Sequence, residues 1–197
     1  MKHTILTLPP LVGPISKRSA TLLWLVAFLV LPAFVDASGP APEKRTQQFE
    51  IRFMTSTIDH HLMGVEMAEL CVQKVTAPPP QTDDDLRALC AQIAAAQSAE
   101  VQQLQQWLLQ WYGIAYEGRP RGTLKPLERL SGEQFDVAIS EEFIEHHAVQ
   151  IENSLRCLQE AFHPELLETC KNQIVTQSEE ILDFRLILMD HGVATLR

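Results

Sequence analysis

The sequence predicts an all-α protein, a four-helix bundle made of two copies of a helical hairpin. Apolar residues recur every three or four positions along four long stretches, as expected for amphipathic helices. A set of residues in the first half of the chain also returns in the second half at the same offsets. Two hairpins of amphipathic helices can bury their apolar stripes against each other as a bundle.

The first 37 residues are predicted to be an export signal rather than part of the bundle. Basic residues precede an apolar run over residues 20–35, and Val35 and Ala37 suit the −3 and −1 positions of a cleavage site. The run holds 16 residues and contains Pro32, whereas a membrane-spanning helix needs roughly 20 residues. We therefore expect a signal peptide over residues 1–37 and a mature protein in the periplasm or secreted, with no membrane contact after cleavage. An uncleaved anchor is the alternative.

Two histidine pairs mark the internal repeat. Ile58-Asp59-His60-His61 in the first half corresponds to Ile144-Glu145-His146-His147 in the second half. A cysteine stands eleven positions after the first histidine of each pair, at Cys71 and Cys157. Further along, a cysteine, a glutamine and a glutamate keep identical offsets in the two halves: Cys90, Gln97 and Glu100, then Cys170, Gln177 and Glu180.

The repeat sets the predicted boundaries. The bundle is expected over residues 50–191, with the first copy over 50–112 and the second over 134–191. Residues 38–49 are predicted to be a flexible N-terminal segment. Residues 113–133 are rich in glycine, proline and basic side chains and are predicted to be the connector.

Local signals predict where the helices begin and end. Ala-Pro-Pro-Pro over residues 77–80 cannot continue a helix, and Thr82, followed by three aspartates, is expected to cap the second one. Gly113 is expected to end the second helix. Ser131 with Gln134 three residues later is predicted to form a capping box for the third helix, and Pro164 suits the first turn of the fourth.

The four cysteines are predicted to form two disulfides. An oxidising compartment makes an even number of cysteines candidates for disulfide bonds. Of the three possible pairings, only Cys71–Cys90 with Cys157–Cys170 respects the repeat and closes each hairpin locally. A thiolate metal site is the alternative.

The same spacing places the histidines. Eleven residues make nearly three helical turns, so His60 is expected on the stripe of Cys71 and His146 on the stripe of Cys157. Each leading histidine should then face the partner helix of its hairpin. Counting along the hairpins brings each histidine pair close to a Gln-x-x-Glu turn, Gln97/Glu100 or Gln177/Glu180. A carboxylate beside an imidazole fixes its tautomer and raises its basicity, as is usual behind a metal-ligating histidine.

These residues resemble a known family. Ile-Asp-His-His followed by Met67-Ala68, then Gln-x-x-Glu-Val and Trp107-Leu-Leu-Gln-Trp-Tyr-Gly113, is similar to domain-of-unknown-function family 305. This ferritin-like family includes the CopM-type copper-binding proteins, and the resemblance covers about residues 50–191. It implies an exported ferritin-like four-helix bundle. For some members it implies copper binding in the periplasm through histidines and methionines.

The resulting functional hypothesis is a metal-binding protein whose cargo is copper or another late transition metal. The predicted ligands are His60, His61, His146, His147, Met63 and Met67. The predicted supporting residues are Gln97, Glu100, Gln177 and Glu180. Two histidines at adjacent helical positions are not expected to face one point, so a tight site should combine one histidine from each copy, with Glu100 or Glu180 near by. Weaker surface sites of one histidine and one methionine are the alternative geometry. Proton competition should weaken binding as the pH drops through roughly 6.5, the unperturbed histidine pKa.

A second hypothesis is a disulfide-stapled structural or protein-interaction bundle with no metal. In that case the histidine pairs are buried, hydrogen-bonded structural elements. A solvated acidic stripe is expected at Asp59 and Glu66 and could serve a partner. His163 and His191 lie at helix ends and are expected to be exposed, while Trp107 and Trp111 are expected to be packing anchors.

Other function classes are disfavoured. The net charge of −9 and the pI near 5.2 argue against nucleic acid, which requires a basic face. A di-iron carboxylate centre needs a Glu-x-x-His from each of two helices, and the chain has one, Glu160 to His163. The sequence lacks a phosphate-binding loop and a His-Glu-x-x-His motif. We therefore expect no enzymatic activity.

Overall fold

The computed structural model describes residues 38–75 and 81–193, with only the backbone for residues 81–84. The predicted signal peptide, the Pro-rich turn at 77–80 and the capping side chain of Thr82 therefore lie outside the described part of the chain. The described helices are α1 (Lys44–Lys74), α2 (Gln81–Tyr112), α3 (Lys125–Glu128), α4 (Glu133–Glu160) and α5 (Pro164–Asp190). No strand occurs over 38–75 and 81–193, so the all-α prediction is confirmed.

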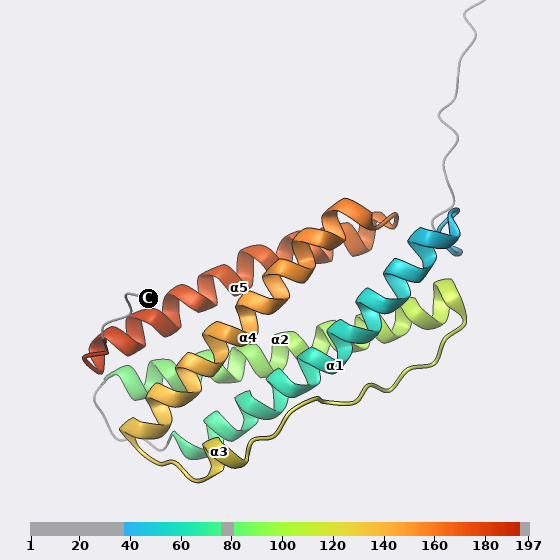
Figure 1. Ribbon diagram of the computed structural model, residues 1–197. Coiled ribbons are helices and arrows are strands. Elements are labelled where there is room, and N and C mark those ends of the chain that lie inside the picture. The colour runs from blue at the N-terminus through green and yellow to red at the C-terminus, as the bar shows by residue number, and fades with distance from the viewer. Residues whose placement is uncertain (1–37, 76–80, 194–197) are drawn as a thin grey trace, which may run out of the picture. The chain divides into compact units, whose positions relative to one another are not determined.

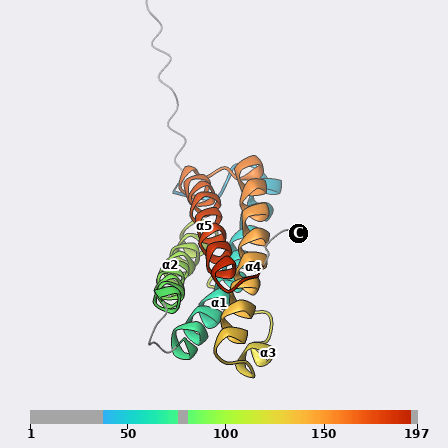
Figure 2. The same cartoon turned by 90° about the vertical axis from the view of Figure 1, so that its left-hand side faces the viewer.

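The long helices form two hairpins that pack on each other. α1 packs along α2, and α4 packs along α5 (Figure 1). The hairpins meet mainly between α1 and α4, while α2 and α5 make a lighter contact (Figure 2). The connector runs back beside α1 to the short helix α3, which lies near the start of α4 (Figure 1). None of the described helices has an apolar stretch long enough to cross a membrane.

Two helix ends follow the predicted signals and one does not. Gly113 adopts a φ of 67°, and its N–H donates to the carbonyl of Leu109, which ends α2 as expected. Pro164 opens α5. The capping box predicted at Ser131 is wrong, because the residue before α4 is Gly132 and no side chain caps the helix. Gly132 has a φ of 55°, which a glycine adopts without strain.

The predicted flexible segment over 38–49 is partly helical. α1 begins at Lys44, six residues before the expected start of the bundle. Ala41 and Phe49 are buried, and the side-chain amide of Gln47 donates to the Ala41 carbonyl at 2.7 Å. Packing of Phe49 against Phe53 and burial of Glu50 hold this first turn and a half of the helix in place.

The disulfides join the predicted partners. Cys71 is bonded to Cys90 and Cys157 to Cys170, with Cα–Cα distances of 6.2 Å in both cases. All four cysteines are therefore oxidised, and the thiolate metal site is not formed.

The core has apolar ends and a polar middle. One apolar cluster surrounds Cys71–Cys90, where α1 ends, α2 begins, α4 begins and α5 ends. The other surrounds Cys157–Cys170 at the opposite ends of the same helices. Between the clusters lie buried and half-buried polar side chains, which we call the polar layer: His60, His61, Gln97, Glu100, His146, His147, Gln150, Gln173, Gln177 and Glu180.

Candidate metal centre

The four predicted histidine ligands meet in the polar layer at the centre of the bundle. His61 and His147 are completely buried, His146 is buried and His60 is half-buried. They come from the middle of α1 and the middle of α4, so the helix pair that joins the two hairpins carries all four. The sequence predicted these residues but not their arrangement.

His60 and His146 form a reciprocal pair across the α1–α4 contact. Their rings stack with centroids 3.7 Å apart and planes inclined by 10°. The Nε2 atom of each ring lies 3.0 Å from the backbone carbonyl of the other residue. A carbonyl only accepts, so both Nε2 atoms carry the proton and both Nδ1 atoms carry a lone pair.

Gly64 makes this close approach possible. A β-carbon on Gly64 would lie 2.8 Å from Cε1 of His146 and 2.1 Å from Oε1 of Gln97. Both distances are too short for van der Waals contact. A glycine is therefore needed in the middle of α1, although glycine weakens a helix interior.

The second histidine of each pair meets the predicted glutamate. Nε2 of His61 lies 2.6 Å from Oε2 of Glu100 in a well-formed hydrogen bond. Nε2 of His147 lies 2.8 Å from Oε2 of Glu180, but this contact lacks hydrogen-bond alignment. The two copies therefore differ at this point.

The expectation that His60 and His146 face the partner helix of their own hairpin is wrong. That expectation assumed 3.6 residues per turn, whereas the seam between packed helices follows a period nearer 3.5. Three repeats of 3.5 residues make about 10.5 residues. Counted back from Cys71, they end midway between positions 60 and 61. The two side chains therefore flank the seam, with His61 towards α2 and His60 towards α4.

His146 and His147 bring two ring nitrogens together. Their Nδ1 atoms are 3.5 Å apart. This corrects the expectation that adjacent histidines cannot face one point, because side-chain torsions turn both rings towards the space between them. The Nδ1 atom of His61, at the corresponding place in the first copy, is buried without a hydrogen-bond partner among the described residues.

Burial keeps the stacked histidines neutral. Desolvation, with the neighbouring His61 second, lowers the pKa of His60 to about 4. Desolvation, with the stacked His60 second, lowers the pKa of His146 to about 2. Proton competition for these two rings therefore belongs well below pH 6.5, and the expected midpoint near 6.5 is corrected for them.

The predicted glutamines lie in the polar layer but do not hold the histidines. Gln97 and Gln177 are each 3% exposed. Both amide atoms of Gln97 and the oxygen of Gln177 are buried without a hydrogen-bond partner among the described residues. Free amide groups of this kind can serve a ligand or water inside the bundle.

A polar network behind His61 was not predicted. The amide of Gln173 donates to Oε2 of Glu100 at 3.1 Å. The carbonyl oxygen of Gln173 accepts from Ser154 at 2.8 Å and from Gln150 at 3.0 Å. The available signal was a set of polar residues at core-facing positions of α4 and α5.

The predicted methionine ligands have other surroundings. Met67 packs in the apolar cluster around Cys71–Cys90. Met63 lies under the connector, where its Sδ is 3.2 Å from the place of a β-carbon on Gly122. Their role as ligands stays a prediction.

The solvated acidic stripe is wrong for Asp59 and right for Glu66. Glu66 is exposed, whereas Asp59 is buried against the connector. The Asp59 carboxylate accepts hydrogen bonds from the Tyr116 hydroxyl at 2.6 Å and the Arg119 backbone N–H at 2.7 Å, and it pairs with Arg121. The connector supplies donors that the sequence did not place beside α1.

The expected exposure of His163 is also wrong. His163 is completely buried, and its Nδ1 lies 2.6 Å from the buried carboxylate of Glu50. Its ring stacks on Trp111 with centroids 3.8 Å apart. Glu50 also accepts from the Tyr112 hydroxyl and from two backbone N–H groups at the start of α5. His191 is half-buried near Glu133.

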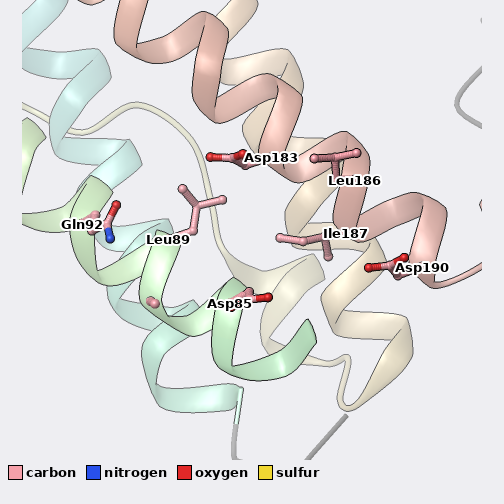
Figure 3. Close-up of a pocket in the computed structure, with 8 residues that line it drawn as sticks. Asp85, Leu89, Gln92, Asp183, Leu186, Ile187 and Asp190 are labelled. Carbon is pink, nitrogen blue, oxygen red and sulfur yellow. The ribbon is translucent and has the colours of Figure 1, made fainter. Parts of the chain in front are cut away.

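Within the polar layer, the Nδ1 atoms of His146 and His147 approach each other. Over residues 38–75 and 81–193, no three His, Cys, Asp or Glu side chains converge as a three-ligand metal site requires. A hollow of about 450 Å³ opens elsewhere, between α2 and α5 (Figure 3). Asp85, Asp183 and Asp190 line it, and no predicted site residue does.

Comparison with known proteins identifies the family and the fold. Residues 50–188 match the family described as "Domain of unknown function (DUF305)". No protein of curated function matches the sequence. The solved structure "CopM in the Cu(I)-bound form" is similar with a TM-score of 0.63 and 22% identity, over 72% of this chain and 96% of that chain. "CopM in the Ag-bound form (by soaking)" has a TM-score of 0.63, 22% identity and 72% and 95% coverage. "CopM in the Cu(II)-bound form" has a TM-score of 0.61, 22% identity and 72% and 96% coverage. At this identity the likeness shows a common fold.

Proposed function

Because this chain belongs to the DUF305 family, we propose that it is an exported copper-handling protein that binds the monovalent ion at its consecutive histidines. Its role is binding and transfer or buffering, without catalysis. The cargo is copper, and silver in the same oxidation state has the same preference for nitrogen and sulfur ligands. The solved CopM structures with Cu(I), Cu(II) and silver support copper as the cargo.

The observation that carries the proposal is the approach of Nδ1 of His146 to Nδ1 of His147. The hydrogen bond from Nε2 of His146 to the His60 carbonyl leaves a lone pair on its Nδ1. The Glu180 carboxylate beside Nε2 of His147 favours the same tautomer there. The two Nδ1 atoms lie 3.5 Å apart, and they repel only if neither carries a proton and no metal ion lies between them. Either a metal ion or a proton on His147 fills this place.

The donor geometry fits a two-coordinate ion. Imidazole nitrogens bind late transition metals at about 2.0 Å, so two nitrogens on opposite sides of one ion stand about 4 Å apart. A small opening of the two rings reaches this separation from 3.5 Å. Monovalent copper and silver accept two ligands in line, whereas zinc prefers four. Two imidazoles without a third converging ligand therefore favour the monovalent ions.

The two disulfides and the signal-like first 37 residues support the proposal that the protein is exported. Oxidised cysteines cannot bind copper as thiolates, so imidazoles and methionine thioethers are the copper donors left in the core. The alternative function, a disulfide-stapled structural or interaction bundle, is supported by the hydrogen bonds that already engage His60, His61 and His146.

The test is a titration of the mature protein with Ag(I), which needs no reductant and so spares the disulfides. Nitrogen chemical shifts of the histidine rings report which ring nitrogen binds. We expect Nδ1 of His146 and His147 to shift, and the variant H146A/H147A to lose at least tenfold in affinity. The variant H191A is the control, because His191 lies outside the polar layer. If the Nδ1 signals do not move and the double variant binds as tightly as the control, the histidines are structural and the bundle has no metal.

A further inference from the structure

A groove between α2 and α5 lies outside the polar layer and has no part in the proposed metal site. It is the hollow of about 450 Å³ between the start of α2 and the end of α5, and we call it the α2–α5 groove (Figure 3). These two helices make a lighter contact than the helices within each hairpin. The groove has an apolar floor and an acidic rim, formed by Leu89, Leu186 and Ile187 and by Asp85, Asp183 and Asp190.

Exposed apolar side chains continue the groove along the outer face of α5. Leu182, Leu186 and Met189 follow one another at helical spacing and are 56%, 50% and 60% exposed. We call these three side chains the outer stripe. A single exposed leucine is ordinary on a protein surface, whereas a row of apolar side chains that joins a hollow is typical of a binding surface.

The internal repeat shows that the fold does not require these side chains. Through the repeat, α5 corresponds to α2, where all four equivalent positions hold glutamine. The correspondences are Leu182 with Gln102, Asp183 with Gln103, Leu186 with Gln106, and Asp190 with Gln110. Three of these glutamines are exposed and the fourth is half-buried. The same helical unit therefore folds with neutral polar residues at these positions, and the leucines and aspartates of α5 give it a different surface.

The charge along the groove has one sign. Asp183 and Asp190 point from α5 towards α2, and Asp85 points towards α5 (Figure 3). Arg87 and Arg185 are exposed on the same stretches of helix but do not line the groove. No Lys, Arg or His occurs among the described residues that line it. A second copy of this chain, with its net charge of −9, would bring like charge to the groove, whereas a basic partner would bring the opposite charge.

The three aspartates suit a long basic side chain better than a metal ion. Within the described parts of the chain, no three His, Cys, Asp or Glu side chains are grouped closely enough to hold a metal ion. A lysine or arginine can lay its aliphatic part on Leu89 and Ile187 and extend its charged end to the rim. The groove therefore accommodates both the apolar and the charged parts of one such side chain.

We propose that the α2–α5 groove and the outer stripe bind a basic amphipathic helix of a partner protein. Such a helix places apolar residues at positions i, i+3, i+4 and i+7 in a groove between helices. The stripe from Leu182 to Met189 is about 10 Å long, so two to three turns of the partner helix cover it. Lysine or arginine at the edges of that helix pairs with the aspartates and orients it. This inference does not depend on metal binding.

The experiment measures binding of synthetic helical peptides to the mature protein by fluorescence anisotropy. One peptide carries leucine at i, i+3, i+4 and i+7 with lysine on both sides, and a second peptide has glutamate in place of lysine. We expect the lysine peptide to bind about tenfold more tightly than the glutamate peptide. Its binding should weaken as the salt concentration is raised, because the aspartates of the rim are exposed. Equal binding of the two peptides would overturn the assignment of a basic partner.

Variants taken from the repeat locate the binding. L182Q/L186Q and D183Q/D190Q give α5 the glutamines that α2 already carries, so both proteins should fold. Each should weaken binding of the lysine peptide by about tenfold. Unchanged binding in both variants would remove the peptide from this groove and overturn the proposal.

Matched controls separate the groove from a general attraction to leucines or acids. L109Q/L155Q removes two leucines that are 58% and 48% exposed and do not line the groove. E66Q/E69Q removes two exposed acidic charges from α1. Both controls should bind the lysine peptide within about twofold of the wild type. A control that loses as much binding as its groove variant would overturn the proposal.

Sedimentation of the mature protein tests the other occupants. We expect a monomer. A dimer that L182Q/L186Q dissolves would assign the surface to a second copy of the chain. Peptide binding that occurs only after removal of residues 194–197 would assign the groove to this chain itself. Either of these two results would overturn the proposal of a partner helix.

Discussion

The imidazole rings of His60 and His146 lie face to face across the bundle, and each donates its Nε2 proton to the other residue's backbone carbonyl. This exchange joins the two hairpins at their central point of contact. It also fixes the tautomer of both rings, so their Nδ1 lone pairs are directed away from each other's carbonyl. A structural contact between the copies thereby prepares the ring nitrogens for a ligand.

The reciprocal pair gives a first prediction. H60F or H146F keeps a ring in the stack but leaves a buried carbonyl without its donor, so each should cost about 1–3 kcal/mol of unfolding free energy. The double variant should cost less than the sum, because the two changes act on one contact. Urea unfolding of the four proteins checks this. Simple additivity would mean that the two hydrogen bonds are independent of each other.

The stability of the metal-free protein should fall as the pH drops from about 6.5 towards 4. Burial lowers the pKa of His60 to about 4, whereas an unfolded histidine titrates near 6.5. In this window the unfolded chain takes up a proton that folded His60 does not, so the stability present above pH 6.5 is lost on acidification. The loss from His60 alone is on the order of 3 kcal/mol. Urea unfolding at pH 7.5 and 4.5 should show a smaller loss in H60F/H146F than in the wild type.

The buried Glu50–His163 pair should contribute strongly to stability. Both side chains are completely buried, so E50Q or H163F leaves a buried polar group without its partner and should cost about 3–5 kcal/mol. The matched control is E168Q, because Glu168 and Lys171 form an exposed pair worth less than about 1 kcal/mol. Thermal unfolding of the three variants compares them. Equal effects of E50Q and E168Q would contradict the burial of the first pair.

Removing either disulfide should destabilise the bundle by about 3 kcal/mol. The bridges span 19 and 13 residues, so the chain-entropy model gives similar values for C71S/C90S and C157S/C170S. Denaturant unfolding measures the cost, and peptide mapping without reductant checks the pairing. A link between the two halves of the chain would contradict the hairpin arrangement.

Replacing Gly64 with alanine should destabilise the protein, which is the opposite of the effect that helix propensity predicts. Alanine normally stabilises a helix interior by roughly 0.5–1 kcal/mol relative to glycine. In G64A the new methyl group would overlap Gln97 and His146, so we expect a loss of about 1–3 kcal/mol and weaker Ag(I) binding. G39A, where a β-carbon meets open space, should be neutral. A stabilised G64A would show that the polar layer can open without cost.

The sequence by itself determined the helices, the two hairpins and the disulfide partners. These features depend on residues near in the chain: apolar spacing within a helix, Gly113 and Pro164 at helix ends, and cysteines that flank one turn. The repeat then identified the histidine pairs and the glutamates that meet them, because a duplicated unit places equivalent residues at equivalent depth.

Only the tertiary structure decided how the histidines are used. The stacking of His60 on His146, the approach of Nδ1 of His146 to Nδ1 of His147 and the support of Glu100 by Gln173 all depend on how one hairpin docks on the other. Burial of Asp59 and His163 likewise depends on donors and acceptors supplied by distant segments. Helical spacing records which face of its own helix a residue occupies. It does not record which helix covers that face. A shift of half a residue in the line of contact between two packed helices turns a different histidine towards the neighbouring helix.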